Sequence, residues 1–419
     1  MKVLGFDNWT GGAHHFSRLL PAFRRAGLEL MLVHLGSWGN DTGRPAREKF
    51  GDLEVRDISS YGSNSLTRLL DVERPDAVLF FSTDTFSHRA LNRYCRQRGI
   101  PTVHVYHGVI RVQAINRGSM YKVNFFAQAR FAGSRLGKAF RYVWPAYGRA
   151  LWTTGATWAE WRRFAADIRN ITGGRYIKVA ADDARTSKCG VYTEADVGHA
   201  RDKYGFEPGD AVAVGNPDLI QFGLTESLIG HHLEHDRSGA TDVMYIDTGL
   251  IFTGWVFTSE AEFVAHMIGT MEALKRQGHR LLFKPHPDHR RGNVLPQLVA
   301  AGVEICANAD FVARLQSCCA AITEPSSLSL VPALMGMPLF LASFGQLRGC
   351  SFGEVLLTYP RGRILEDVGD ANRHLAEVSN DNRAATQAWI RDNSGPLPAE
   401  QMPDRVAALF TGLLVEKKA

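Results

Sequence analysis

A histidine between two prolines is the residue pattern with the clearest chemical use in this 419-residue chain. The turn Lys284-Pro285-His286-Pro287 follows an apolar segment that is typical of a buried β-strand. Proline fixes its own φ angle, so the two prolines restrict how the backbone presents His286. Lys284 and His286 can each form charge-assisted hydrogen bonds to a phosphate. The pattern predicts a phosphate-binding turn, with a tight turn and an incidental histidine as the alternative.

A second turn in the same half of the chain suits the same ligand. The expected strand Ala320–Thr323 leads into Glu324-Pro325-Ser326-Ser327, and a helix is expected over Ser326–Met335. Ser326 is a good N-cap, and the first backbone N–H groups of a helix are free to bind an anion. A capped helix without a ligand is the alternative. Two such turns at the carboxyl ends of strands favour one shared phosphate site.

The two turns resemble the HP and S motifs of GT-B glycosyltransferases that use CMP-activated acid sugars, above all the bacterial β-Kdo transferases and the related sialyltransferases. Gly215-Asn216-Pro217 resembles the segment that closes the N-terminal half in these enzymes and in polyglycerol-phosphate transferases. The resemblance implies an enzyme whose donor is a CMP-activated sugar, with no obligatory cofactor and no metal. It places in the nucleotide site Lys284, His286, Glu324, Ser326, Ser327 and Asn216.

The reaction implied by the resemblance is transfer of β-Kdo from CMP-Kdo to a bacterial surface polysaccharide or lipopolysaccharide, as in capsule or O-antigen synthesis. A sialyltransferase and a CDP-glycerol-type glycerophosphotransferase stay open as alternatives. Free Kdo carries a carboxylate at its anomeric carbon. Lys284, Arg290 and Arg291 lie close to the motifs in the sequence and could bind that carboxylate.

Two carboxylates are candidates for the catalytic acids that the resemblance implies, one in each half of the chain. Asp247 follows the expected strand Val243–Ile246 and would attack or support the anomeric carbon, and His286 would assist at the phosphate. Glu160 would handle the proton of the acceptor hydroxyl. A turn aspartate and a solvated helix residue are the respective alternatives, and Asp84 is the reserve base. Retention or inversion depends on whether Asp247 is a nucleophile or a base.

A basic segment rich in tryptophan, residues 130–163, is expected to form the acceptor surface. It contains seven Lys and Arg residues, one acid and four of the eight tryptophans, namely Trp144, Trp152, Trp158 and Trp161. Flat aromatic rings stack on sugars, and arginines pair with phosphates or carboxylates. The segment therefore indicates an anionic, lipid-linked glycan acceptor, with an amphipathic helix that buries its tryptophans as the alternative.

A competing motif, His231-His232-Leu233-Glu234-His235, has the H-x-x-E-H spacing of zinc proteases. A helix would put His231 and His235 on one face, as two metal ligands require. The motif lies in a polar stretch expected to be a linker, where a short helix is a poor platform for zinc. A zinc hydrolase using these histidines with Glu234, and a non-catalytic glycan-binding module, are the alternatives from other functional classes.

Short apolar segments alternate with amphipathic ones along the chain, which predicts an α/β protein. The expected architecture is GT-B, with two Rossmann-like domains that face each other across a cleft. Residues 1–225 would form the acceptor-side domain and residues 240–400 the domain that binds the nucleotide sugar. Residues 401–419 would form a C-terminal helix that packs back on the N-terminal domain. Ligands in such sheets bind at the carboxyl ends of the strands.

The composition is that of an ordinary globular protein, with 45% hydrophobic and 22% charged residues. The net charge of +5 is too small to suggest a dedicated nucleic-acid binder. No apolar run reaches the roughly 18 residues of a membrane span. The six cysteines form no C-x-x-C pair. We expect a cytoplasmic protein, with peripheral contact with the inner membrane or with other polysaccharide-assembly enzymes.

Overall fold

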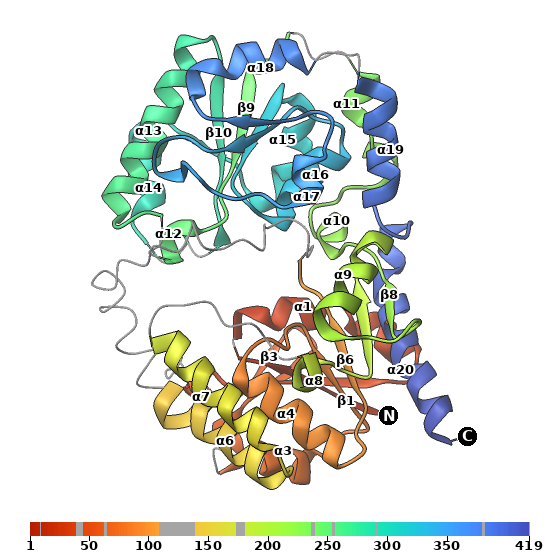
Figure 1. Ribbon diagram of the computed structural model, residues 1–419. Coiled ribbons are helices and arrows are strands. Elements are labelled where there is room, and N and C mark those ends of the chain that lie inside the picture. Colours follow the sequence, from red (N-terminus) through yellow and green to blue (C-terminus); the bar gives the residue numbers. More distant parts are fainter. Residues whose placement is uncertain are drawn as a thin grey trace. The chain divides into compact units, whose positions relative to one another are not determined.

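The chain divides into two units, each built around one sheet. The computed structural model describes residues 1–419 except 9, 39–44, 63–64, 109–138, 173–180, 236–238, 254–255, 288, 290–291, 379–381 and 419. Unit 1 comprises Met1–His107, Gln128–Gly215 and Glu400–Ala419. Unit 2 comprises Gly108–Ala127 and Asn216–Ala399. Figure 1 shows helices on both sides of the sheets, which confirms the predicted α/β class.

The sheet of unit 1 has the strand order β3-β4-β2-β1-β5-β6-β7-β8. Only the edge strand β3 is antiparallel to its neighbour. The strands are β1 (Lys2–Asp7), β2 (Glu29–His34), β3 (Arg47–Phe50), β4 (Leu53–Asp57), β5 (Ala77–Phe80), β6 (Thr102–Val105), β7 (Lys188–Val191) and β8 (Ala211–Ala213). The central strands read as almost continuous apolar runs because helices cover both faces of a parallel sheet.

One face of this sheet packs against helices that include α3, α4, α6 and α7, which Figure 1 shows side by side. Phe16 of α1 lies against the other face, where a Cβ atom at Gly5 would come within 2.6 Å of the Phe16 ring. The helices of unit 1 are α1 (Ala13–Ser17), α2 (Leu20–Arg25), α3 (Leu66–Glu73), α4 (Phe86–Gln97), α6 (Trp144–Thr153), α7 (Trp158–Thr172), α8 (Ala181–Ala184), α9 (Glu194–Tyr204) and α20 (Met402–Lys418).

Helix α20 comes from the end of the chain and packs on α2, β6 and β7 of unit 1. The buried rings of Phe410 and Phe23 lie 5.3 Å apart. Arg25 pairs with Asp404 at 2.7 Å, and Arg405 donates a hydrogen bond to the carbonyl of Val214. Unit 1 therefore needs residues from both ends of the sequence. Within the described part of the chain, no helix combines the length and apolar character that a membrane crossing requires.

The sheet of unit 2 is parallel throughout, with the order β11-β10-β9-β12-β13-β14. Its strands are β9 (Asp242–Ile246), β10 (Arg280–Lys284), β11 (Glu304–Ile305), β12 (Ala320–Thr323), β13 (Leu339–Ala342) and β14 (Gly362–Leu365). Strand β9 occupies the middle, between β10 and β12. The order is that of a Rossmann fold.

Helices cover the sheet of unit 2, and Figure 1 shows α13 and α14 together beside β9 and β10. Ser259 caps the long helix α13 by accepting a hydrogen bond from the backbone N–H of Glu262. The helices are α10 (Pro217–Gln221), α11 (His231–Glu234), α12 (Leu250–Thr253), α13 (Glu260–Arg276), α14 (Val294–Ala300), α15 (Phe311–Ser317), α16 (Leu330–Leu334), α17 (Glu354–Leu357), α18 (Ala371–Glu377) and α19 (Arg383–Asn393).

Candidate functional site

The strand order of unit 2 changes direction between β9 and β12. The chain passes from β9 outward to β10 and β11, and then returns to place β12 on the other side of β9. In open parallel sheets, ligands bind outside the carboxyl ends of the two strands at such a point. The loop Asp247-Thr248-Gly249 follows β9, and Glu324-Pro325-Ser326-Ser327 follows β12. The His-Pro turn follows β10, so the structure brings both predicted turns to strand ends beside β9.

Asp247 connects the loop after β9 to the His-Pro turn. Its Oδ2 accepts a hydrogen bond from the backbone N–H of His286 at 2.9 Å and lies 2.8 Å from Nε2 of His289. Its Oδ1 accepts a hydrogen bond from the N–H of Gly249 at 3.0 Å. The residue is only 3% exposed, whereas the sequence-based expectation was a carboxylate facing the ligand. A nucleophile needs an accessible oxygen, so its predicted catalytic role has no support from this geometry.

Glu324 connects the Ser-Ser turn to the same loop. Its Oε2 accepts hydrogen bonds from the backbone N–H of Thr248 at 3.0 Å and from Oγ1 of Thr248 at 2.7 Å. Its Oε1 accepts one from the hydroxyl of Tyr245 at 3.0 Å. Complete burial and, secondarily, the charge of Asp247 raise the pKa of Glu324 to about 8. Glu324 therefore fixes the loop after β9 to the Ser-Ser turn.

The backbone of Gly249 lies close to the ring of His286, and Gly249 has a φ angle of +76°. A Cβ atom at Gly249 would lie 2.8 Å from Cγ of His286. The side chain of His286 itself is half-buried, and its ring centroid lies 6.1 Å from that of Phe252. The N–H of His286 is thus fixed by Asp247, and one side of its imidazole lies against Gly249. The rest of the imidazole is partly exposed.

The Ser-Ser turn differs in detail from the expected long helix. Ser326 has an extended backbone, and its Oγ accepts a hydrogen bond from the N–H of Leu328 at 3.1 Å. A 3-10 turn, Ser327–Ser329, follows, and helix α16 has only five residues. Both Ser326 and Ser327 are half-buried. The turn offers hydroxyl and N–H groups to an anion, but the dipole of a long helix contributes nothing here.

Lys284 and Asn216 are buried and do not lie open to a ligand. The ammonium of Lys284, a residue only 2% exposed, lies 5.6 Å from the ring centroids of Phe222 and Phe311 and donates to the carbonyl of Pro285. This corrects the expectation that Lys284 reaches the phosphate or the sugar carboxylate. Asn216 caps α10 through a hydrogen bond from the N–H of Asp218 at 2.9 Å. Arg290 and Arg291 lie outside the described residues.

Glu160 belongs to unit 1, where it forms a capping box with Thr157 at the start of α7. Its Oε2 accepts hydrogen bonds from the N–H and the hydroxyl of Thr157, and the hydroxyl accepts one from the N–H of Glu160. Its other oxygen pairs with Arg93 at 2.5 Å. Both oxygens of the carboxylate thus have structural partners. The reserve base Asp84 is likewise paired, with Lys203 and the hydroxyl of Tyr204.

Histidines at the carboxyl edge of unit 1 were not among the predicted site residues. His107 follows β6, is exposed, and its Nδ1 lies 2.7 Å from the carbonyl oxygen of Phe81. The ring centroid of His15 lies 6.1 Å from that of His107 and 3.8 Å from that of His14. Burial and then the charge of Arg18 strongly lower the pKa of His15. The available signal was a histidine directly after an apolar strand, the same signal that identified His286.

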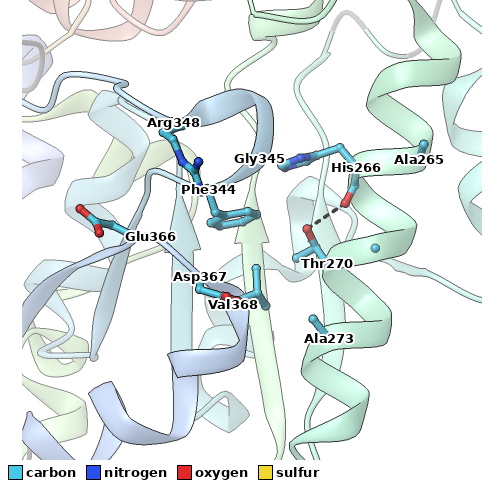
Figure 2. Close-up of a pocket in the computed structure, with 11 residues that line it drawn as sticks. Ala265, His266, Thr270, Ala273, Phe344, Gly345, Arg348, Glu366, Asp367 and Val368 are labelled. Carbon is cyan, nitrogen blue, oxygen red and sulfur yellow. Dashed lines mark hydrogen bonds between the residues drawn. The ribbon is translucent and has the colours of Figure 1, made fainter.

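A hollow of about 360 Å³ lies elsewhere in unit 2, between α13 and the loops after β13 and β14 (Figure 2). The ring of His266 stacks on that of Phe344, with centroids 5.2 Å apart and planes 7° apart. Burial lowers the pKa of His266 to about 4. Arg348 and the acids Glu366 and Asp367 also line the hollow, so its charge is mixed and it favours no single ligand class.

The H-x-x-E-H motif forms helix α11, which is only four residues long. The rings of His231 and His235 stack with centroids 4.1 Å apart, and Nδ1 of His235 lies 2.9 Å from the carbonyl oxygen of His231. In the described part of the chain, no group of three or more His, Cys, Asp and Glu side chains is arranged to hold a metal ion. The motif therefore has no zinc-binding geometry in those residues.

Comparison with known proteins identifies the fold. No family model and no curated protein matches the chain. Among solved structures, it is similar to the wall teichoic acid polymerase TagF soaked with CDPG (TM-score 0.53, 10% identity, 99% of this chain and 89% of that one). It is also similar to the calicheamicin glycosyltransferase CalG4 (0.52, 14%, 99% and 98%). A third similar structure is described as a UDP-N-acetylglucosamine 2-epimerase from Listeria monocytogenes (0.50, 12%, 99% and 97%).

These neighbours confirm the predicted fold class, a GT-B fold of two Rossmann-like domains. At 10–14% identity, the similarity is one of fold and does not transfer a substrate.

Proposed function

We propose that this chain is a GT-B glycosyltransferase that binds the phosphate of a nucleotide-activated sugar at the carboxyl edge of unit 2. One observation carries the proposal. The His286 turn and the Ser326-Ser327 turn end the two strands that flank β9, and buried carboxylates fix both turns to the β9 loop. Rigid donors that face a developing phosphate charge are an effective way to stabilise a leaving group.

The proposed donor is CMP-Kdo, and the proposed acceptor is a bacterial surface polysaccharide or lipopolysaccharide, carried on a lipid at the cytoplasmic face of the membrane. The support for CMP is the resemblance of the two turns to the motifs of CMP-sugar transferases. In this reaction, the phosphate of CMP leaves as the sugar–oxygen bond breaks, and His286 with Ser326 or Ser327 would neutralise it. These groups supply the necessary charge and hydrogen bonds without an obligatory cofactor.

Asp247 and Glu160 are both held by structural partners. We therefore propose that Asp247 is a positioning residue for the His286 turn.

A glycerophosphotransferase that uses a CDP-activated donor is the second candidate, together with a sialyltransferase. The first is favoured by the similarity in fold to TagF, whose structure was soaked with CDPG. Both alternatives would use the same two turns. A sialyltransferase also uses a CMP-sugar, so the choice between CMP and CDP separates the glycerophosphotransferase from the two CMP-dependent reactions.

Thermal unfolding of the full chain with CMP, CDP and UDP tests the proposal. At 100 times its dissociation constant, a nucleotide that binds only the folded protein stabilises it by about 2.7 kcal/mol. We expect CMP to stabilise the wild type and His235→Ala, but not His286→Ala. His235 is a matched control because it is an exposed histidine of the same unit. Preference for CDP would favour the glycerophosphotransferase, and a shift that survives in His286→Ala would contradict the assigned site.

A further inference from the structure

Two tryptophans of unit 1 are almost fully exposed. Trp152 is 78% exposed and Trp158 is 76% exposed. They lie near the end of α6 and at the start of α7, on either side of a four-residue connection. Trp144 and Trp161, on the same two helices, pack against the core of the unit. Tryptophan is strongly buried on average, so two neighbouring exposed rings indicate a surface that contacts something.

The charges around these rings come from arginines that form no ion pair with a described residue. Four exposed arginines occur on α6 and α7, namely Arg149, Arg162, Arg163 and Arg169, and none of them forms an ion pair with a described residue. The two acids of these helices are already engaged. Glu160 binds Arg93 and Thr157, and Asp167 is buried beside Arg89. The free charge of the surface is therefore positive.

We infer that this α6–α7 surface, defined by Trp152, Trp158, Arg149, Arg162 and Arg163, docks on the surface of an anionic lipid bilayer. Tryptophan rings favour the depth of the lipid headgroups, where one part of the ring is apolar and the N–H is hydrated. Arginines are attracted by anionic headgroups. Neither the tryptophans nor the arginines alone would attach the protein firmly to a membrane, but here both kinds of residue occur on the same two helices.

The positive charge of the α6–α7 surface favours an anionic bilayer over a second copy of this chain as its binding partner. A second copy of this chain would bring the same arginines opposite one another, and like charges would repel. A glycan could also stack on the rings, but it would not require an anionic lipid, so the vesicle experiment separates it from a bilayer. The inference does not depend on the proposed reaction.

Flotation of the full chain with lipid vesicles tests the inference. We expect the wild type to float with phosphatidylcholine vesicles that contain phosphatidylglycerol and not with pure phosphatidylcholine vesicles. The double variant Trp152→Ser, Trp158→Ser should bind about tenfold more weakly, because it loses two interfacial rings. Phe50→Ser is the matched control, since Phe50 is 46% exposed on β3 and lies outside the α6–α7 surface.

Two further readouts keep the test decisive. Brominated lipid should quench the fluorescence of the wild type, and the double variant should lose most of that quenching. Added salt should release the wild type, because headgroup attraction is screened. Failure of the wild type to float with anionic vesicles, or equal flotation of the double variant and the wild type, would overturn the inference. A circular dichroism melt that matches the wild type shows that the double variant is folded.

Discussion

Asp247 and Glu324 are buried acids whose partners are loop N–H groups, hydroxyls and a histidine, and no lysine or arginine among the described residues pairs with either. A buried carboxylate is costly unless hydrogen bonds compensate for the lost water. Here the compensation comes from the loops that would surround the nucleotide phosphate. The hydrogen bonds that offset the cost of burying these two side chains also fix the positions of the loops.

The pH dependence of stability should reveal the raised pKa of Glu324. Between the ordinary pKa of a glutamate and about 8, the folded protein keeps a proton on Glu324 that the unfolded chain releases. The free energy of unfolding should therefore fall as pH rises through this range, by up to about 1.4 kcal/mol per pH unit. Glu324→Gln, which stays neutral, should lack this slope. Denaturant unfolding from pH 5 to pH 9 measures the difference, and parallel curves would contradict it.

Asp247→Asn separates a positioning role from a nucleophilic one. An amide nitrogen in place of Oδ2 would face the N–H of His286 and Nε2 of His289, whereas the flipped amide would face the N–H of Gly249. Either orientation loses an acceptor, and we expect a loss of about 1–3 kcal/mol of stability. Nucleotide binding should weaken at the same time, because the His286 turn loses its anchor. Asp367→Asn is a control, since Asp367 accepts only the N–H of Gly369 at an exposed site. An inactive Asp247→Asn variant with normal stability and normal nucleotide binding would instead indicate a direct catalytic role, as a nucleophile or a base.

At the scale of single residues, the positions of the turns were easier to predict from the sequence than the burial of their side chains. The position of Asp247 at a strand end was predictable from the apolar run before it. Its burial was not, because it depends on His289 and on the backbone of His286, which belong to the neighbouring strand's loop. The burial of Lys284 was not predictable for the same reason. Its aromatic partners, Phe222 and Phe311, are distant in the sequence.

Among the elements, the β9 loop is the one whose shape depends on a single glycine. Gly249→Ala should displace the His286 turn and weaken nucleotide binding about tenfold or more, because the new Cβ overlaps the imidazole. Gly278→Ala is a matched control. Gly278 also has a positive φ angle, of +84°, but a Cβ there would meet nothing within 4 Å. Both variants should lose stability through backbone strain, and calorimetric titration with CMP should distinguish them.

Helix α7 offers an equally direct test of Glu160. Glutamine preserves a capping box, so Glu160→Gln should retain most activity, whereas Glu160→Ala should lose about 1 kcal/mol of stability. A catalytic base would behave differently. Both variants would then lose turnover by roughly 100-fold or more while remaining folded. Turnover and melting temperature, measured together on the two variants, decide between these roles.

The regular elements were easier to predict from the sequence than the turns between them. Strand β12 matches the expected Ala320–Thr323, since a short apolar run before a turn is a local signal. The helix expected over Ser326–Met335 instead begins at Leu330. Proline cannot donate to the i−4 carbonyl, but it is tolerated in the first turn of a helix. Pro332 therefore fits a helix that begins at Leu330, after a 3-10 turn.

On the scale of the whole molecule, the alternation of apolar and amphipathic segments was sufficient to predict an α/β fold, and the resemblance supplied the GT-B architecture. The strand order was beyond this reasoning, because pairings such as β1 with β5 or β9 with β12 join residues far apart in the chain. The location of the site at the β9–β12 switch point depends on that order.

Phe410→Ala tests how far unit 1 relies on the end of the chain. Phe410 is fully buried against Phe23, so its truncation should cost about 3–5 kcal/mol. The loss should appear in the unfolding of unit 1, while stabilisation of unit 2 by CMP persists. Hydrogen exchange resolves the two units in one experiment. Uniform destabilisation of both units would contradict their independence.

The origin of α20 also sets the order in which the molecule can mature on the ribosome. The segment Asn216–Ala399 is synthesised before Glu400–Ala419. The sheet of unit 2 can therefore form before helix α20 of unit 1 has been synthesised. Most of unit 1 is made first, yet the surface around Phe23 stays uncovered until Phe410 has been synthesised. The N-terminal half of the nascent chain should therefore be the part that chaperones bind longest.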